Sequence, residues 1–241
     1  MAGSWEIREQ RKVFCAILTR EQVTMAWALA FKNLIIPGQA GVLTGMPFDM
    51  ARNTACQQAL DGGFEYLFFL DDDCCPPPDA ILRLLSHNVP IVSGVYYRRS
   101  NPIGFPVMLR NVPGGRKYVT EYKIPDLIEV DYVGAGCLLI HRSVLEQMPP
   151  QQRPCPNCKT TFDSEHRWFD WRVDWLDRDT DGLNRLSEDY QWNEWARKNG
   201  FKIMVDTSIQ CRHIGLAEAR LHREGDKVQP IYVPAEMRVM G

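Results

Sequence analysis

Residues 66–73 decide the fold, and they read Tyr66-Leu67-Phe68-Phe69-Leu70-Asp71-Asp72-Asp73. The first five are apolar or aromatic without a polar residue between them, a pattern typical of a strand that is buried on both faces of a sheet. Three carboxylates follow at once, where such a strand leaves the sheet. Because ligands of open α/β sheets bind at the carboxyl ends of the strands, this junction is the first candidate for a functional site.

Further strands and helices alternate around this segment. Apolar runs predict strands over 13–18, 41–44, 91–95, 127–132, 137–141 and 201–205, and the spacing of apolar residues predicts helices over 21–34, 49–60, 79–87, 143–148 and 187–198. Asp49 is placed to cap the second helix. Segments 105–109 and 117–122 flank a Pro-Gly-Gly turn and predict a hairpin, whereas we expect the tail after residue 214 to be mostly irregular. The alternation predicts an α/β protein with a mainly parallel sheet flanked by helices.

Composition narrows the class of protein. The chain has 241 residues, 45% of them hydrophobic and 24% charged, which is enough to bury the core of one domain. A formal net charge of −2 argues against bulk electrostatic capture of nucleic acid, although it leaves room for a local basic patch. The longest apolar runs, 66–70 and 133–140, are far shorter than the roughly 20 residues that span a bilayer. With a polar segment at 1–12 and eight cysteines lacking disulfide-scaffold spacing, we expect a soluble, cytoplasmic protein with reduced thiols.

The three adjacent aspartates predict a cation. Neighbouring carboxylates repel one another, and an apolar strand beside them adds a desolvation cost. A bound divalent cation would remove that cost, and oxygen ligands suit Mg²⁺ or Mn²⁺. The alternative is a solvated acidic turn that caps the helix after Pro76-Pro77-Pro78.

Four blocks of sequence carry a family resemblance. They are 50–73, 91–99, 130–142 with its Gly134-Ala135-Gly136 motif, and 187–215. In this order they resemble the GT-A fold glycosyltransferases, particularly the family-2-like group, over roughly residues 13 to 216. The resemblance implies a GT-A-like, Rossmann-like mixed sheet, mainly parallel and flanked by helices, in one domain spanning 1–241. Residues 1–110 would form the nucleotide-sugar half, 111–216 the acceptor half with an insertion at 149–182, and 217–241 a C-terminal tail.

The resemblance also implies an activity and a metal site. The activity would be that of a hexosyl- or pentosyltransferase, which moves a sugar from a nucleotide diphospho-sugar to an acceptor hydroxyl with the help of Mn²⁺ or Mg²⁺. Asp71 and Asp73 match the ends of the D-x-D motif and are both expected at the metal site: Asp73 would ligate the metal, and Asp71 would lie near the ribose or a metal-bound water. His213 matches a late histidine that supplies a further metal ligand. The residues expected to bind the nucleotide-sugar are Thr19, Arg20, Arg52, Asp71, Asp72 and Arg212.

Ser187-Glu188-Asp189 supports two compatible interpretations. Taken alone, it is a helix start, with Ser187 at the N-cap and two acids facing the positive end of the helix dipole. By resemblance it is the E-D motif, whose acid accepts the proton of the acceptor hydroxyl, and Asp189 is the preferred base with Glu188 second. Direct attack assisted by Asp189 would invert the anomeric configuration, although branches with a late metal-binding histidine include retaining enzymes.

The insertion contains two further metal-like motifs. Cys155 and Cys158 have the spacing of half a zinc site, and His166 is the nearest additional ligand, so structural Zn²⁺ competes with free thiols or a redox pair. Residues 177–188 fit the acidic positions and the glycine of a calcium-binding loop. An acidic solvated loop is the simpler interpretation, because Asn184 stands where an apolar residue normally packs and the loop is unpaired in the sequence.

Aromatic and basic residues surround the E-D motif. Trp168, Phe169, Trp171 and Trp175 either stack on an acceptor or fasten the insertion onto the core. Arg212, Arg220, His222 and Arg223 either clamp the diphosphate or form a solvated basic helix face.

Two other functions remain open at the level of sequence. A nucleotidyltransferase would need a glycine-rich loop with an activating Lys or Arg near the first strand, which 18–21 lacks. A non-catalytic binding module could use the zinc motif and the aromatics to hold a partner. The sugar, the nucleotide and the acceptor, whether glycan, lipid, protein or modified nucleic-acid base, are not specified.

Overall fold

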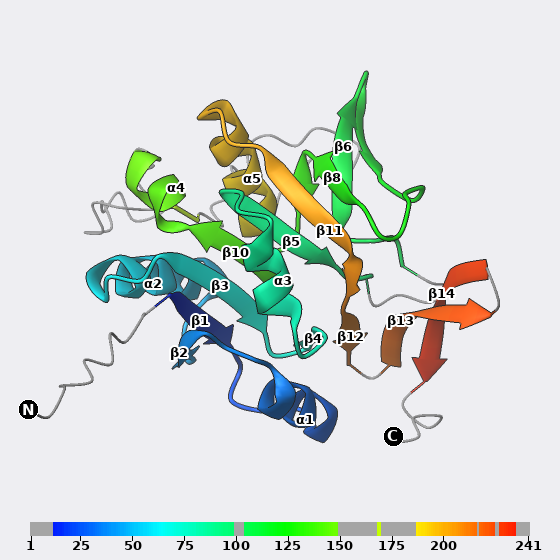
Figure 1. Cartoon of the computed structure of the whole chain (residues 1–241), viewed down its shortest axis with the longest axis horizontal. Coiled ribbons are helices and arrows are strands. Elements are labelled where there is room, and N and C mark those ends of the chain that lie inside the picture. Colours follow the sequence, from blue (N-terminus) through cyan, green and yellow to red (C-terminus); the bar gives the residue numbers. More distant parts are fainter. Residues whose placement is uncertain are drawn as a thin grey trace, which may run out of the picture.

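The computed structural model describes residues 12–98, 104–148, 168–169 and 187–215, and the backbone of 217–224 and 227–234. Within these ranges the chain forms a seven-stranded central sheet with helices on both faces (Figure 1). Its strands lie in the order β2 (Gly38–Leu43), β1 (Val13–Leu18), β3 (Tyr66–Asp71), β10 (Cys137–His141), β5 (Ile91–Val95), β11 (Ile203–Gln210) and β8 (Leu127–Val130).

Strand direction confirms the predicted fold class. β1 pairs in parallel with both β2 and β3, and β5 pairs in parallel with β11. β10 runs antiparallel between β3 and β5, and β8 runs antiparallel at the edge. Five of the seven strands therefore point the same way, so the sheet is mixed and mainly parallel.

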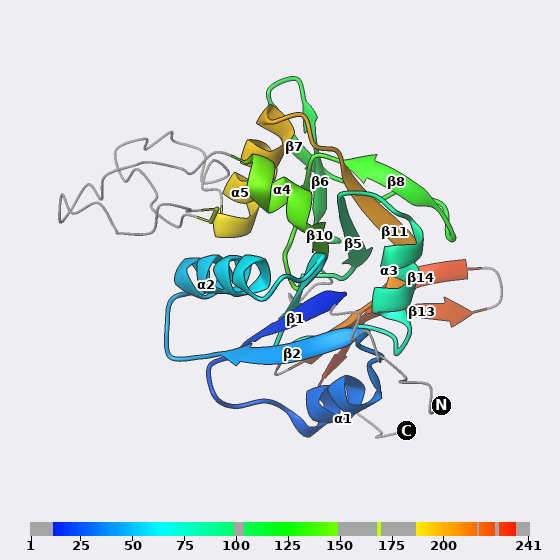
Figure 2. The ribbon, with the colours of Figure 1, turned by 60° about the vertical axis from the view of Figure 1, so that its left-hand side comes forward.

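The central strand β3 is buried on both sides, as its sequence predicts. Leu67 and Phe69 join the core cluster under α2 (Phe48–Asp61), α4 (Arg142–Gln147) and α5 (Glu188–Lys198). Phe68 and Leu70 join the opposite cluster under α1 (Met25–Asn33) and α3 (Ala80–Ser86). Figure 2 shows α1 and α2 on opposite sides of the sheet. Each of these fully buried side chains contributes roughly 1.5–3 kcal/mol of transfer free energy, which fixes the strand that carries the aspartates.

Two helix starts differ from the prediction. α1 begins at Met25 rather than near Glu21, because the chain first turns at Glu21, whose φ is 79°. Thr24 then caps the helix: its side chain accepts a hydrogen bond from the amide of Trp27 at 3.2 Å. α2 begins at Phe48 with Pro47 at the N-cap, so Asp49 lies inside the first turn and does not cap it.

Two smaller sheets complete the described part of the chain. β7 (Gly115–Tyr118), β6 (Met108–Val112) and β9 (Tyr132–Val133) form one. It contains the predicted hairpin, with the first strand shifted by three residues and the second strand earlier and shorter than predicted. β4 (Cys74–Cys75), β12 (Arg212–Ile214), β13 (Ala217–Glu224) and β14 (Lys227–Pro234) form the other.

The expectation of an irregular tail is wrong. β13 and β14 pair antiparallel over their whole length, from Ala217 opposite Pro234 to Glu224 opposite Lys227. The signal in the sequence is Gly225-Asp226, a two-residue connection typical of a tight hairpin. Arg220, His222 and Arg223 therefore lie on a strand and not on a helix face.

None of the helices in the described ranges has the length and the apolar character that crossing a membrane requires.

Candidate active site

The predicted acidic residues meet at the carboxyl end of β3. Asp71, Asp72 and Asp73 form the turn that leaves the strand, Glu188 and Asp189 begin α5, and β12 places His213 beside the turn. Each of the three aspartates has a separate partner: Asp71 contacts Arg52, Asp72 contacts the amide of Arg20, and Asp73 contacts His213. The residues that the sequence nominated are thus brought together from five segments of the chain.

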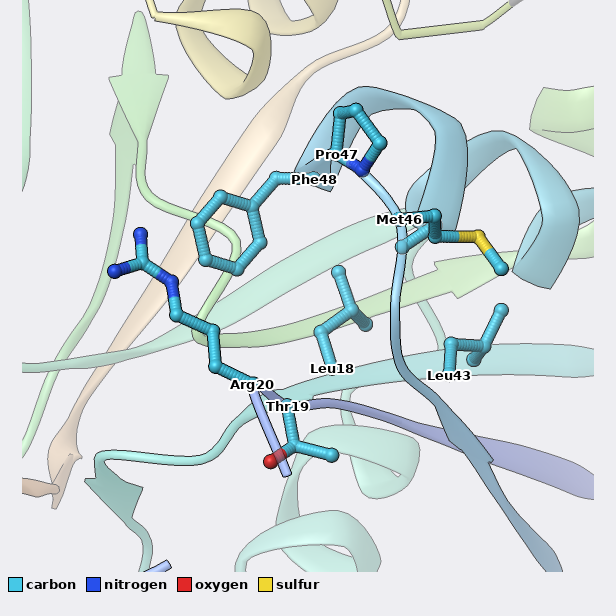
Figure 3. Close-up of a pocket in the computed structure, with 8 residues that line it drawn as sticks. Leu18, Thr19, Arg20, Leu43, Met46, Pro47 and Phe48 are labelled. Atoms are coloured by element: carbon cyan, nitrogen blue, oxygen red, sulfur yellow. The ribbon is translucent and has the colours of Figure 1, made fainter. Parts of the chain in front are cut away.

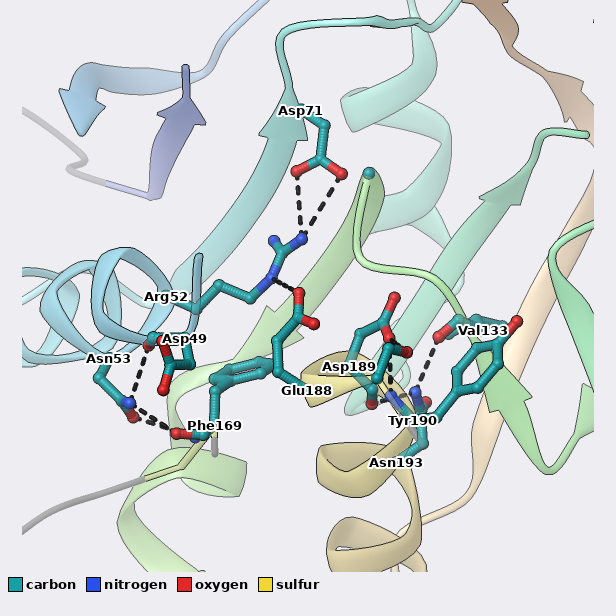
Figure 4. A network of polar contacts seen from close by, with 12 residues as sticks. Asp49, Arg52, Asn53, Asp71, Val133, Phe169, Glu188, Asp189, Tyr190 and Asn193 are labelled. Carbon is teal, nitrogen blue, oxygen red and sulfur yellow. Dashed lines mark hydrogen bonds and ion pairs between the residues drawn. The ribbon is translucent and has the colours of Figure 1, made fainter. Parts of the chain in front are cut away.

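Arg52 connects the two halves of the site (Figure 4). It projects from α2 and is 3% exposed. Its Nη2 lies 3.2 Å from Oδ1 of Asp71, and its Nε lies 3.3 Å from Oε1 of Glu188. The guanidinium carbon lies 5.1 Å from the centre of the Phe69 ring and 5.9 Å from that of Phe169. Burial acts to lower the pKa of Arg52, but the carboxylates of Asp71 and Glu188 outweigh it, so the pKa is raised and the cation is permanent.

Nη1 of Arg52 is a buried donor without an acceptor among the described residues. A buried nitrogen of this kind costs about 1–3 kcal/mol if nothing accepts its hydrogen. It is consistent with a site that a polar ligand or water completes.

Glu188 and Asp189 differ in environment although they are neighbours. Glu188 is 5% exposed, and burial together with the charge of Asp189 raises its pKa from 4.5 to about 7 against the opposing effect of Arg52. Asp189 is half-buried, and its Oδ1 accepts hydrogen bonds from the amide of Tyr190 at 2.8 Å and from the hydroxyl of Ser187. Ser187 is therefore at the N-cap as predicted, but its side chain holds Asp189 rather than a helix amide.

Several charged neighbours act on the pKa of Asp71. Burial raises its pKa, Arg52 opposes this rise, and the charges of Asp73 and Asp189 add to it. Its backbone amide lies 3.3 Å from the carbonyl oxygen of Gly136, which fixes the turn to the loop before β10.

Asp73 and His213 form a pair with the chemistry of metal ligands. Register places His213 opposite Cys74, and Nε2 of the imidazole lies 3.3 Å from Oδ1 of Asp73. Nδ1 lies 2.8 Å from the carbonyl oxygen of Tyr97, which can only accept, so Nδ1 carries a hydrogen. In the neutral imidazole, Nε2 then presents a lone pair toward the carboxylate, and only a proton or a metal cation between them makes the contact favourable. The pair thus has two donor types that suit a divalent cation. The described residues contain no group of three or more His, Cys, Asp and Glu side chains arranged to hold a metal.

Tyr96 is a site residue that sequence reasoning missed. It follows β5 and is 6% exposed, and its hydroxyl accepts a hydrogen bond from the amide of Gly136 at 3.1 Å. Its ring contacts the imidazole of His213 edge to face, with centroids 5.2 Å apart. Burial and the charges of Asp71 and Asp189 raise its pKa well above the ordinary value, so the phenol stays protonated. The available signal was its position directly after the buried run 91–95, at the same edge of the sheet as the aspartates.

A pocket of about 320 Å³ adjoins the aspartate turn (Figure 3). It contains Thr19 and Arg20 at the end of β1, and its other lining residues are Leu18, Leu43, Met46, Pro47, Phe48 and Ala51. The guanidinium carbon of Arg20 lies 5.1 Å from the centre of the Phe48 ring. The amide of Arg20 donates to Oδ2 of Asp72 at 3.1 Å, so the pocket and the turn share one hydrogen-bonded edge. A flat, partly polar group fits between such walls.

Trp168 and Phe169 are buried residues of the hydrophobic core. They are 3% and 0% exposed. Oδ1 of Asn53 accepts the amide hydrogens of both residues, at 2.7 Å and 3.0 Å, and Nδ2 of Asn53 donates to the carbonyl of Phe169. Of the two interpretations of these aromatics, attachment of the insertion to α2 is the one the contacts support.

The remaining nominated residues fall into two groups. Arg212 lies on β12 opposite Cys75, next to His213. Cys155, Cys158, His166, Trp171, Trp175 and residues 177–186 of the calcium-like motif lie outside the described residues.

No protein-family model matches the chain, and no curated protein matches it by sequence. Among solved structures, the crystal structure of A197 from STIV matches with a TM-score of 0.57 and 15% sequence identity, over 87% of this chain and 90% of that one. A glycosyltransferase involved in the glycosylation of the major capsid of PBCV-1 matches with a TM-score of 0.30 and 15% identity, over 56% of this chain and 62% of that one. The second similarity is too low to support an argument. The first shows that this chain shares the α/β fold of A197 over most of its length.

Proposed function

We propose that the protein is a glycosyltransferase that moves a hexosyl or pentosyl group from a nucleotide diphospho-sugar to an acceptor hydroxyl with the help of Mn²⁺ or Mg²⁺. The observation that carries the proposal is the 3.3 Å approach of His213 Nε2 to Asp73 Oδ1 at the carboxyl end of β3. Two further features support it: a carboxylate pair at the start of α5, and a pocket at the end of β1.

Asp73 and His213 would hold the cation, and oxygens of the donor diphosphate and water would complete its ligands. The chemistry that the cation supplies when bound is neutralisation of the charge that develops on the leaving diphosphate. The pocket containing Thr19 and Arg20 would take the nucleotide base between Phe48 and the end of β1. Because Asp72 ties Arg20 to the aspartate turn, base and diphosphate would be bound by parts of one rigid edge.

Asp189 is the preferred base within this proposal. Its carboxylate is half-buried, and Ser187 and the amide of Tyr190 hold Oδ1, which leaves Oδ2 as the oxygen that would accept the hydroxyl proton. Glu188 is tied to Arg52 and buried, so its role would be to hold the start of α5 against the donor half. Direct attack assisted by Asp189 would invert the anomeric configuration.

Calorimetric titration with a panel of uridine and guanosine diphospho-sugars, with and without Mn²⁺, tests the proposal. We expect at least one donor to bind more tightly with Mn²⁺, and Asp73→Asn to remove that metal-dependent gain. Asp79→Asn is the matched control, because this acid lies beyond β4 at the start of α3, is 54% exposed and pairs with Arg83 across one helical turn. If no nucleotide sugar binds in either condition, the proposed function is wrong; if Asp73→Asn retains the gain, the assignment of the metal is wrong.

A further inference from the structure

Tyr96 contacts both sides of the proposed cation site through its two ends. The hydroxyl end accepts the amide hydrogen of Gly136 at 3.1 Å, and the carbonyl of the same Gly136 accepts the amide hydrogen of Asp71. One glycine therefore joins the phenol to the backbone of the aspartate turn through two hydrogen bonds. Removing the phenol oxygen would therefore free Gly136 to move, and the backbone amide of Asp71 would move with it.

The ring end of Tyr96 supports His213. The two rings are 5.2 Å apart at an interplanar angle of 82°, so an edge of one faces the plane of the other. The carbonyl of the next residue, Tyr97, holds Nδ1 of the same imidazole. Residues 96 and 97 thus orient the imidazole from two directions, by ring contact and by hydrogen bond.

The glycines of the neighbouring loop show how closely the phenol is held. A Cβ at position 134 would lie 1.9 Å from the hydroxyl oxygen of Tyr96, a distance that no side chain could occupy without moving the ring. A Cβ at position 136 would lie 3.1 Å from Oδ2 of Asp71 and 3.3 Å from the same hydroxyl oxygen. Glycine at 134 leaves the space that the phenol oxygen takes, and glycine at 136 spares its neighbours a displacement of a few tenths of an ångström.

We propose that Tyr96 is a positioning residue that sets the placement of the Asp71–Asp73 turn relative to His213, and so the geometry of the cation site. The proposal rests on the proposed function, because it assigns Tyr96 a task only if Asp73 and His213 hold a cation. Tyr96 makes no contact with substrate in this role and acts through Gly136 and the imidazole.

Binding of Mn²⁺ alone, followed by water-proton relaxation, tests the role without turnover. Tyr96→Phe keeps the ring but removes the oxygen that holds Gly136, and we expect Mn²⁺ affinity to fall about 10- to 100-fold, as is usual when a group that orients a metal ligand is lost. Tyr122→Phe is the control, because it removes a different hydrogen-bonded phenol oxygen, which is partly buried and lies 2.5 Å from the hydroxyl of Tyr97. Both variants should lower the thermal unfolding midpoint to a similar extent, whereas only Tyr96→Phe should weaken Mn²⁺ binding.

Hydrogen exchange of the parent protein gives a second readout that does not depend on the yield of a variant. Mn²⁺ should slow exchange of the Gly136 and Asp71 amides together, since Gly136 takes part in both hydrogen bonds. Unchanged Mn²⁺ affinity in Tyr96→Phe, or Mn²⁺ protection of Asp71 without Gly136, would overturn the role of Tyr96 while leaving the proposed function intact. Absence of Mn²⁺ binding by the parent protein would overturn the metal assignment and, with it, the role of Tyr96, whereas the proposed function itself is tested by donor binding.

Discussion

The Glu188→Gln substitution should make the protein more stable at alkaline pH. In the unfolded chain this carboxyl titrates near 4.5, whereas burial and the charge of Asp189 raise its pKa in the folded protein to about 7. The folded state therefore binds the proton more tightly. The resulting contribution to stability is complete below pH 4.5 and is lost as the pH rises through 7.

The size of the effect follows from the difference between the pKa of Glu188 in the unfolded and in the folded protein. Each tenfold change in the acid dissociation constant corresponds to 1.36 kcal/mol, so ionised Glu188 costs the folded state about 3 kcal/mol relative to its protonated form. Glutamine has nearly the shape of the protonated acid and does not titrate. The variant should therefore match the parent near pH 4.5 and exceed its free energy of unfolding by about 3 kcal/mol at pH 8.

Urea unfolding followed by tryptophan fluorescence, at intervals from pH 4.5 to 8, measures this difference. Glu129→Gln is the control, since Glu129 is 53% exposed and pairs with the 72% exposed Lys202. An exposed pair of this kind contributes about 0–1 kcal/mol, with little dependence on pH in this range. A difference between Glu188→Gln and the parent that stays constant across the range would refute the environment assigned to Glu188.

Two further substitutions test the polar network. Arg52→Met keeps the apolar contact with Phe69 but leaves Asp71 and Glu188 without their cation. We expect the free energy of unfolding to fall by about 3–5 kcal/mol at pH 8, and by less at pH 5, where Glu188 is protonated. An equal loss at both pH values would contradict the ion pair. Asp189→Asn should bind the donor like the parent and turn over at least about 10²-fold more slowly, as measured by nucleotide release; unchanged turnover would move the role of base to another residue.

Local sequence patterns predicted the elements that carry the site. The run from Tyr66 to Leu70 has no polar residue, and a strand of that kind has one stable environment, between two layers of helices. Ser187-Glu188-Asp189 combines a cap residue with two acids that favour the positive end of a helix, so the start of α5 was predictable to the residue.

Contacts between distant segments were not predictable in the same way. The Arg52–Glu188 ion pair joins residues 136 positions apart, and neither side chain has a local pattern that names its partner. Tyr96 was missed because a tyrosine after a buried strand is usually a core residue, and its contacts with Gly136 and His213 arise only when β5, β10 and β12 assemble. The β13–β14 hairpin was missed because its basic residues were interpreted as a helix face and the segment as an irregular tail, although Gly-Asp in the sequence is a hairpin signal.

The partners of the three aspartates bear on where a cation would sit. Repulsion among three adjacent carboxylates was the first reason to expect a metal. In the folded chain the charge of Asp71 is balanced by Arg52, and Asp72 is stabilised by the amide of Arg20. Asp73 faces Nε2 of His213, whose Nδ1 already donates its hydrogen to the carbonyl of Tyr97. In the neutral imidazole, Nε2 therefore presents a lone pair to the Asp73 carboxylate, and this contact contains no positive charge. Within the proposed function, Asp73 and His213 are the pair with the donor types of metal ligands, whereas Asp71 is also engaged by Arg52. We therefore expect Asp73→Asn to weaken Mn²⁺ binding more than Asp71→Asn does, as measured by water-proton relaxation.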